Sequence, residues 1–155
     1  MEQLTGAGAL AVSDLFSYLE GDWELTRTIN DLRMDMPGSM SGTTAITRQP
    51  DKDGKPALTY REEGLLCFGD YKETVHRGYE YCFPEAHKAL VLFSDGRLFH
   101  ELDLSSGFFQ VEHLCVEDTY RGRFRVESPN VWLSNWHVTG PTKELILDNR
   151  YQRLG

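Results

Sequence analysis

The chain has 155 residues, a length typical of one domain that is large enough to bury a hydrophobic core. Its formal net charge is −8, from 24 acidic and 16 basic residues, which disfavours binding to the phosphate backbone of a nucleic acid. Apolar residues make up 40% of the chain, as in globular rather than disordered proteins, and no run of about 18 apolar residues predicts a membrane span.

The three cysteines, Cys67, Cys82 and Cys115, stand far apart and include no Cys-x-x-Cys pair. An odd number at wide spacing indicates buried free thiols rather than a disulfide framework or a zinc site. Residues 1–12 contain no basic stretch and include acidic Glu2, so the sequence does not indicate a secretory signal. We therefore expect a cytoplasmic protein that binds neither nucleic acid nor membrane.

A short helix is predicted at about residues 13–20. Ser13 can cap its first turn, and Leu15 and Leu19 follow at helical spacing. Gly21 then ends the helix, because glycine accepts the backbone conformations that follow a last helical turn.

From about residue 22 to 153, runs rich in Thr, Val, Tyr, Phe and Trp alternate with turn signals. The turns lie at Met36–Gly38, Asp51–Gly54, Gly69-Asp70, Pro84-Glu85, Asp95-Gly96, Ser106-Gly107, Glu117-Asp118, Pro129-Asn130 and Pro141-Thr142. About ten strands joined by short turns predict a mainly β fold, a single antiparallel up-and-down β-barrel, because closing a sheet removes its exposed edges. We expect residues 1–155 to form this one barrel domain.

Alternation along the strands separates an outer from an inner face. In residues 119–127, charged side chains at odd positions alternate with Tyr120 and Phe124 among the even positions. The charged set must face solvent, so the even positions face the interior. The same alternation turns His100 and His113 inward.

Turn positions then predict which residues lie opposite one another in neighbouring strands. The inner row that they predict comprises, in order, His100, His113, Gly122 and His137. Asn135 shares this inner face, whereas Trp132 and Trp136 face outward and form an apolar patch. We expect the N-terminal helix or a second copy of the chain, in a homodimer, to cover that patch.

A second polar group is predicted in the first half of the chain. One two-residue turn places Glu62 opposite Arg77 and Tyr60 opposite Tyr79, and Arg27 falls among the inward positions of the first strand. A buried ion pair that only maintains the strand register would give the same pattern. A carboxylate, two arginines and several tyrosines inside one barrel nevertheless favour a pocket over a dry core.

Our leading hypothesis is an intracellular barrel that binds a small, partly polar or anionic organic ligand. Barrels of this size can enclose one small ligand, arginines favour an anion, and aromatic walls suit a ring-bearing body. The predicted ligand-binding residues are Arg27, Tyr60, Glu62, Arg77, Tyr79, His100, His113, Tyr120, Asn135 and His137.

The same polar interior is compatible with catalysis or with metal binding. An isomerase, cyclase or lyase would use an interior acid or base, with an arginine holding a developing oxyanion. The candidates for that acid or base are Glu62, His100, His113 and His137. The histidines could instead bind haem or a metal, although a row across neighbouring strands does not converge, so we assign no metal ligand. They could also be hydrogen-bonded core residues, and the Trp132 and Trp136 patch could serve an adaptor role. The sequence identifies no cofactor.

Gly21-Asp22-Trp23 opens the first predicted strand, and Arg150 and Arg153 lie near the end of the last one. This pairing resembles the calycin superfamily of barrels, the lipocalins and fatty-acid-binding proteins. In those proteins a Gly-x-Trp motif opens the barrel and a late basic residue packs across the tryptophan. The resemblance implies the same arrangement here.

A broader resemblance covers most of the chain. Its matching segments are Gly21-Asp22-Trp23 with Arg27, Tyr60–Gly64, Arg77–Tyr79, Phe93–Arg97 with Phe99-His100, Asp103-Leu104, His113, Asp118 with Tyr120, and Trp136–Lys143. These segments resemble an uncharacterised family of small domains of unknown function found in bacteria and eukaryotes. That family has no assigned reaction, so the resemblance supports the fold and implies no function.

Overall fold

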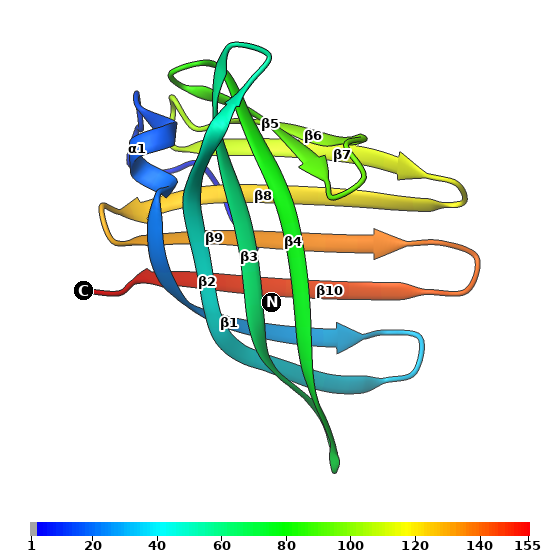
Figure 1. Ribbon diagram of the computed structural model, residues 1–155. Coiled ribbons are helices and arrows are strands. Elements are labelled where there is room, and N and C mark those ends of the chain that lie inside the picture. The colour runs from blue at the N-terminus through cyan, green and yellow to red at the C-terminus, as the bar shows by residue number, and fades with distance from the viewer. Residues whose placement is uncertain (1–2) are drawn as a thin grey trace.

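A computed structural model describes residues 3–155, in which one short helix precedes ten antiparallel strands (Figure 1). Helix α1 spans Leu15–Leu19. The strands are β1 (Gly21–Asp31), β2 (Met36–Lys52), β3 (Lys55–Phe68), β4 (Tyr71–Glu85), β5 (Lys88–Phe93), β6 (Leu98–Asp103), β7 (Phe108–Cys115), β8 (Asp118–Ser128), β9 (Val131–Thr139) and β10 (Glu144–Arg153). The predicted mainly β, up-and-down architecture is confirmed.

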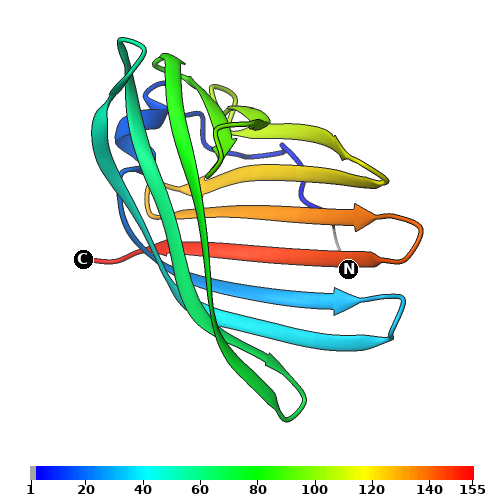
Figure 2. The same cartoon turned by 45° about the vertical axis from the view of Figure 1, so that its right-hand side comes forward.

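All ten strands belong to one sheet, in the order β6-β5-β4-β3-β2-β1-β10-β9-β8-β7. The sheet curls so that the long strands β2 to β4 cross over β8 to β10 (Figures 1 and 2). The first and last strands pair along most of their length, whereas within residues 3–155 no ladder joins β6 to β7. The barrel is therefore nearly closed, with a seam between these two edge strands.

Helix α1 packs against one end of the barrel. Its first turn is capped by the side chain of Asp14, which accepts a hydrogen bond from the Ser17 amide at 3.1 Å. The predicted cap was Ser13, one residue earlier. Both Leu15 and Leu19 are fully buried in the hydrophobic core, so the helix covers the end of the barrel and no outer patch.

Trp23 and Arg153 join the start and the end of the barrel. The Trp23 indole N–H donates to the Leu19 carbonyl at 2.9 Å. The Arg153 guanidinium lies 4.2 Å from the Trp23 ring centroid and donates to the Tyr18 carbonyl at 2.8 Å. The late basic residue that packs across the tryptophan, as the calycin resemblance implied, is therefore present.

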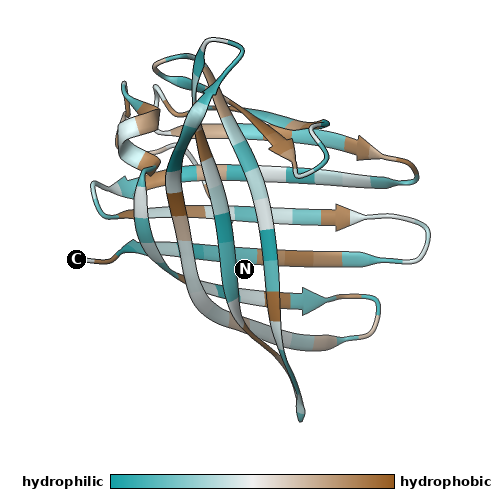
Figure 3. Cartoon of the chain, viewed as in Figure 1, coloured by the Kyte–Doolittle hydropathy of each residue, from teal (hydrophilic) through white to brown (hydrophobic). Residues whose placement is uncertain are grey.

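Most predicted faces are confirmed. In β8 the even positions face the interior and the arginines face outward, and along the strands hydrophilic and hydrophobic residues follow one another in short blocks (Figure 3). The hairpin of β3 and β4 pairs Glu62 with Arg77 and Tyr60 with Tyr79, as predicted. His113 lies opposite Tyr120 rather than opposite the predicted partner, but this shift of two residues keeps it on the inner face.

The predicted faces in β9 are wrong, and one bulge explains the error. The turn between β8 and β9 pairs Ser128 with Val131, as expected, but a register shift between Val126 and Ser128 displaces the rest of the hairpin by one residue. A shift of one residue exchanges the two faces of a strand. Trp136 therefore lies opposite Gly122 on the inner face, and His137 faces outward.

The predicted dimer patch is lost by the same shift. Trp132 is only 1% exposed and belongs to the core, and Trp136 packs against that core. The structure therefore offers no outer surface of these two tryptophans for a homodimer or an adaptor contact. Asn135, which alternates with them, moves to the outer face.

A second bulge shapes β6. Val91 pairs with His100 and Leu92 with Leu98, which leaves Phe99 as an extra residue. Phe99 and His100 are consequently both buried, while Leu98, expected to face inward, is 50% exposed. The bulge thus places one more aromatic ring inside the barrel than simple alternation would.

All three cysteines are free, and only Cys82 is buried; Cys67 and Cys115 are partly exposed. Among residues 3–155, no helix is long and apolar enough to cross a membrane. The interpretation of the N-terminal segment rested partly on Glu2, which lies outside the described residues.

Close contact between β2 and β3 yields a test of the fold. Gly42 lies opposite Gly64, and a Cβ atom at Gly42 would overlap the Glu63 carbonyl oxygen. Gly42→Ala is expected to lower the free energy of unfolding by about 1–3 kcal/mol, measured by urea denaturation. Gly78→Ala is the control, since its Cβ would meet only the Tyr60 carbonyl oxygen, at 3.5 Å. Equal effects of the two substitutions would contradict this packing.

Candidate functional site

A buried ion pair lies inside the barrel. Arg27 on β1 donates from its two terminal nitrogens to the two carboxylate oxygens of Glu62 on β3, at 2.7 and 3.0 Å. The two residues are only 7% and 4% exposed. Arg27 Nε donates to Asn149 Oδ1 on β10, so all three guanidinium nitrogens are hydrogen-bonded.

Tyrosines extend this network from β3 to β10. Tyr60 donates its hydroxyl proton to Glu62 at 2.6 Å, and its oxygen lies 2.7 Å from the Tyr151 hydroxyl. Since the Tyr60 proton goes to the carboxylate, Tyr151 is the donor of the second bond. Asn149 donates in turn to Ser134 Oγ on β9, at 3.0 Å. The Arg27–Glu62 network therefore connects β3 and β1 with β10 and β9.

The network holds Glu62 in its charged form. Burial would raise the pKa of this carboxyl group, but hydrogen bonds and charge from Arg27, with the Tyr60 hydroxyl, outweigh it and lower the pKa. Burial also raises the pKa of Tyr151 to about 12, so the tyrosine remains a neutral donor. A carboxylate that accepts three hydrogen bonds and has a lowered pKa is a poor general base, which disfavours the catalytic role considered for Glu62.

Arg77 carries a charge that this network does not neutralise. It lies directly opposite Glu62 and lines the interior cavity, and the residue is exposed to solvent. No carboxylate of residues 3–155 lies within 4.0 Å of its guanidinium. Among the described residues that line the cavity, two arginines therefore face a single carboxylate.

His100 is a neutral group in the same cavity. Burial lowers its pKa to about 4, and the hydrogen bond to a main-chain carbonyl only partly opposes this effect. That bond joins Nδ1 to the Glu101 oxygen at 2.7 Å. An imidazole with this pKa is unprotonated at pH 7 and is a weak base there.

The interior cavity is small, at about 40 Å³. It has room for about three water molecules, far less than the several hundred Å³ of a pocket for a drug-sized molecule. Its lining residues are Arg27, Tyr60, Glu62, Arg77, Tyr79, Tyr81, Val91, Phe99, His100, Phe124, Trp132, Ser134, Trp136, Leu147, Asn149 and Tyr151. Two buried groups, Trp132 Nε1 and Thr44 Oγ1, have no hydrogen-bond partner among the described residues.

Phe99 fills the space beside this cavity. Its ring centroid lies 4.6 Å from that of Phe93, 5.2 Å from Trp136 and 5.7 Å from Tyr79. It also contacts His113 on β7, at 5.3 Å, so that aromatic packing joins the two sides of the seam. We call Phe99, Phe93, Trp136 and Tyr79, together with Arg77, the mouth of the cavity.

The predicted site residues divide into three groups. The cavity is lined by Arg27, Tyr60, Glu62, Arg77, Tyr79 and His100. His113 and Tyr120 face inward but pack on Phe99 instead of lining the cavity. Asn135 and His137 lie outside, where they bond to Asp148 at 2.6 Å and to Glu144 at 2.9 Å. The prediction that these two line the interior is therefore wrong.

Sequence reasoning missed several residues that line the cavity. Asn149 and Tyr151 alternate on β10, a pattern visible in the sequence, but no turn reveals that this strand pairs with β1. Trp132 and Trp136 were assigned to the wrong face, and Phe99 enters only through its bulge.

No metal centre is formed by the histidines. With His137 outside, the predicted row of three does not converge on one point. Within residues 3–155, no group of three His, Cys, Asp or Glu side chains is arranged to hold a metal ion. The inner row of three histidines that was considered for haem or metal binding is therefore not formed.

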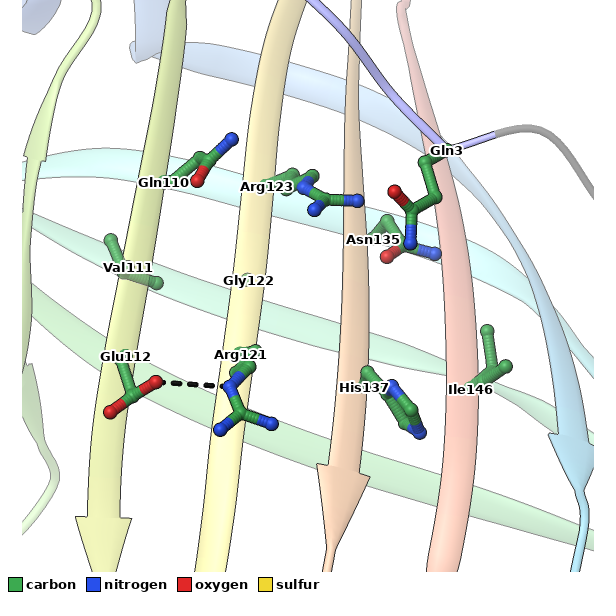
Figure 4. A pocket seen from close by; sticks show the side chains of 10 residues that line it. All are labelled: Gln3, Gln110, Val111, Glu112, Arg121, Gly122, Arg123, Asn135, His137 and Ile146. Atoms are coloured by element: carbon green, nitrogen blue, oxygen red, sulfur yellow. Dashed lines mark hydrogen bonds and ion pairs between the residues drawn. The ribbon is translucent and has the colours of Figure 1, made fainter.

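A larger hollow of about 560 Å³ lies on the outside, over β7 to β10 (Figure 4). This outer hollow is lined by Gln3, Gln110, Val111, Glu112, Arg121, Gly122, Arg123, Asn135, His137 and Ile146. Arg121 and Glu112 neutralise each other across it, at 2.9 Å. The N-terminal segment borders it, held by Arg125, which donates to the Thr5 and Ala7 carbonyls at 2.8 and 2.7 Å.

Comparisons with known proteins bear on family and fold. A family model described as "Family of unknown function (DUF6314)" matches residues 19–153, which confirms the resemblance to an uncharacterised family. No curated protein matches the sequence.

Two solved structures share the fold. The S-type phycobiliprotein lyase CPES from Guillardia theta is similar with a TM-score of 0.70 and 13% identity, over 96% of this chain and 95% of that one. A protein of unknown function of the DUF3598 family, from Nostoc punctiforme, has a TM-score of 0.59 and 13% identity, over 97% of this chain and 52% of that one. At these identities the likeness shows a common fold.

The buried pair can be tested by a double-mutant cycle. Arg27→Met is expected to lower the free energy of unfolding by about 3–5 kcal/mol, because it leaves the Glu62 charge buried without its partner. Glu62→Gln alone is also destabilising. The double variant removes both charges, so its loss of unfolding free energy should be smaller than the sum of the two single losses. Urea denaturation of the wild type and the three variants measures the difference. Additive losses would mean that the two side chains do not interact.

Proposed function

Because the chain belongs to the DUF6314 family of unknown function, we propose its function from the chemistry of its interior: it binds a small organic anion inside the barrel. The observation that carries this proposal is Arg77, a cation that faces the cavity with no carboxylate of residues 3–155 within 4.0 Å. A carboxylate, sulfonate or phosphate group of a ligand would supply the missing negative charge.

Arg27 does not compete for that anion. Its guanidinium already donates to Glu62 and Asn149, so a ligand would have to break a buried ion pair to reach it. In this proposal Arg27 positions Glu62, and Glu62 in turn lies opposite Arg77 and keeps the cavity polar. The two arginines thus have different roles.

The aromatic side chains at the mouth of the cavity can pack against the apolar part of such a ligand. Tyr79, Phe93 and Trp136 surround the Phe99 ring, and all three are only partly buried. Planar organic groups stack favourably on surfaces of this kind. We infer that the preferred ligand combines a planar apolar body with one anionic group.

The space for that body is the space that Phe99 fills. Phe99 lies on a bulge of an edge strand, and no hydrogen-bond ladder in the described chain joins that strand to β7. Displacing it breaks aromatic contacts but no backbone ladder across the seam. The proposal therefore includes an outward movement of Phe99 when a ligand enters.

Two further features fit this proposal. The fold is shared with a protein whose name describes it as a phycobiliprotein lyase, but Glu62 and His100 are both weak bases at pH 7, which favours binding over catalysis here. The three free thiols fit the cytoplasmic setting expected from the sequence.

The charge partner can be tested with two fluorescent probes of similar body, anionic 8-anilinonaphthalene-1-sulfonate and neutral N-phenyl-1-naphthylamine. Arg77→Gln is expected to weaken binding of the anionic probe by about tenfold, because it removes the charge that faces the cavity. Binding of the neutral probe should change little. Fluorescence titration at constant ionic strength gives both dissociation constants.

The matched control is Arg123→Gln, on the outer face of β8, where Arg123 lines the outer hollow and does not line the interior cavity. This substitution should leave both dissociation constants unchanged. Equal weakening by the two substitutions would point to a general surface effect, and an anionic probe that binds Arg77→Gln as tightly as the wild type would refute the proposal.

The mouth can be tested through Phe99→Ala. Removal of the ring enlarges the cavity, so the anionic probe is expected to bind more tightly, even though the free energy of unfolding falls by about 3–5 kcal/mol. Titration of the folded variant and thermal unfolding measure the two effects. A loss of probe affinity in the folded variant would show that Phe99 belongs to the binding surface rather than blocking it.

A further inference from the structure

One nitrogen of His100 has no partner. Nδ1 lies 2.7 Å from the Glu101 carbonyl oxygen, which can only accept, so Nδ1 carries the proton and donates it. In the neutral ring Nε2 then presents a lone pair, and no hydrogen bond joins it to any other residue in the range 3–155. The low pKa of His100, about 4, agrees with this neutral form.

The free acceptor belongs to the interior. His100 is 7% exposed and lines the cavity, and its ring centroid lies 5.4 Å from those of Phe124 and Trp136. Trp136 carries an indole N–H, but no hydrogen bond joins it to His100 in residues 3–155. The fully buried side-chain atoms without a partner in residues 3–155 do not include Nε2, so this atom keeps some accessible surface through which a donor in the cavity can reach it.

The polar network nearby cannot supply that donor. The guanidinium of Arg27 is committed to Glu62 and Asn149. The hydroxyl protons of Tyr60 and Tyr151 are committed as well, the first to Glu62 and the second to Tyr60. The unpartnered Trp132 Nε1 is a donor that lines the same cavity, but no hydrogen bond joins it to His100. A donor for Nε2 is therefore open to be supplied by a molecule in the cavity, either water or a ligand.

We propose that the ligand carries a hydroxyl or N–H group at its buried end, which donates to Nε2 of His100 while its anionic group meets Arg77. This inference rests on the proposed function and narrows the ligand class to planar organic anions with a donor at the end opposite the charge. The cavity of about 40 Å³ fits a single hydroxyl or N–H group at that end. His100 is then a specificity-determining residue that selects donors and rejects apolar ends.

Three probes separate this inference from simple anion binding: naphthalene-2-sulfonate, 6-hydroxynaphthalene-2-sulfonate and 6-methoxynaphthalene-2-sulfonate. The hydroxy compound is expected to bind the wild type about five- to tenfold more tightly than the unsubstituted one, as one additional buried hydrogen bond predicts. The methoxy compound accepts but cannot donate, so it should gain nothing. Isothermal titration calorimetry measures the three dissociation constants.

Variants test whether His100 causes the tighter binding of the hydroxy compound. His100→Phe should abolish it, because the acceptor is gone, whereas His100→Gln should keep part of it through the amide oxygen. His137→Phe is the matched control on the outer face and should leave the ratio of the dissociation constants unchanged. The ratio within each folded variant is compared, so a general loss of affinity does not imitate the result.

Three results overturn the inference in distinguishable ways. Equal binding of the hydroxy and unsubstituted compounds to the wild type overturns the role of His100 and indicates that water satisfies Nε2. If both compounds still depend on Arg77 for binding, the proposed function is unaffected by that result. An advantage that persists in His100→Phe also overturns it. Failure of all three compounds to bind overturns both proposals. The wild-type comparison holds even if a His100 variant does not fold.

Discussion

The ion pair between Arg27 and Glu62 is the interaction on which the interior of this barrel depends. Two charges removed from water are tolerated only when their remaining hydrogen-bonding groups are also satisfied. Here the Tyr60 hydroxyl donates a further hydrogen bond to the Glu62 carboxylate, and Asn149 accepts the remaining hydrogen bond of the Arg27 guanidinium. Because these partners come from β3 and β10, which do not pair with each other, satisfying the pair also aligns strands that no backbone ladder joins directly.

That same pair leaves an imbalance of charge. Glu62 is neutralised by Arg27, so Arg77 faces the cavity without a carboxylate partner in the described chain. The chain as a whole carries −8, yet the described groups that line the cavity carry more positive than negative charge. An acidic exterior around a basic cavity repels polyanions such as nucleic acids while still accepting a small anion. The net charge of the chain therefore does not indicate the sign of the charge inside the cavity.

Sequence reasoning succeeded where a short turn alone determines the pairing. Glu62 and Arg77 were placed opposite each other because a two-residue turn joins their strands without a bulge. It failed at His137 and Trp136, where one extra residue between Val126 and Ser128 exchanges the two faces of the strand. No residue type in that segment indicates the bulge. Asn149 and Tyr151 were missed for another reason, since closure of the barrel pairs the first strand with the last without any connecting turn. Local chemistry thus predicts hairpins well and predicts closure and bulges poorly.

The proposed function depends on an organic anion that binds inside the barrel against Arg77. The most direct measurement is a crystal structure of the protein with 6-hydroxynaphthalene-2-sulfonate. We expect the sulfonate within hydrogen-bonding distance of Arg77, the Phe99 ring displaced, and the hydroxyl group beside His100. A sulfonate bound in the outer hollow beside Arg121 and Arg123, with the interior unchanged, would contradict the proposed function.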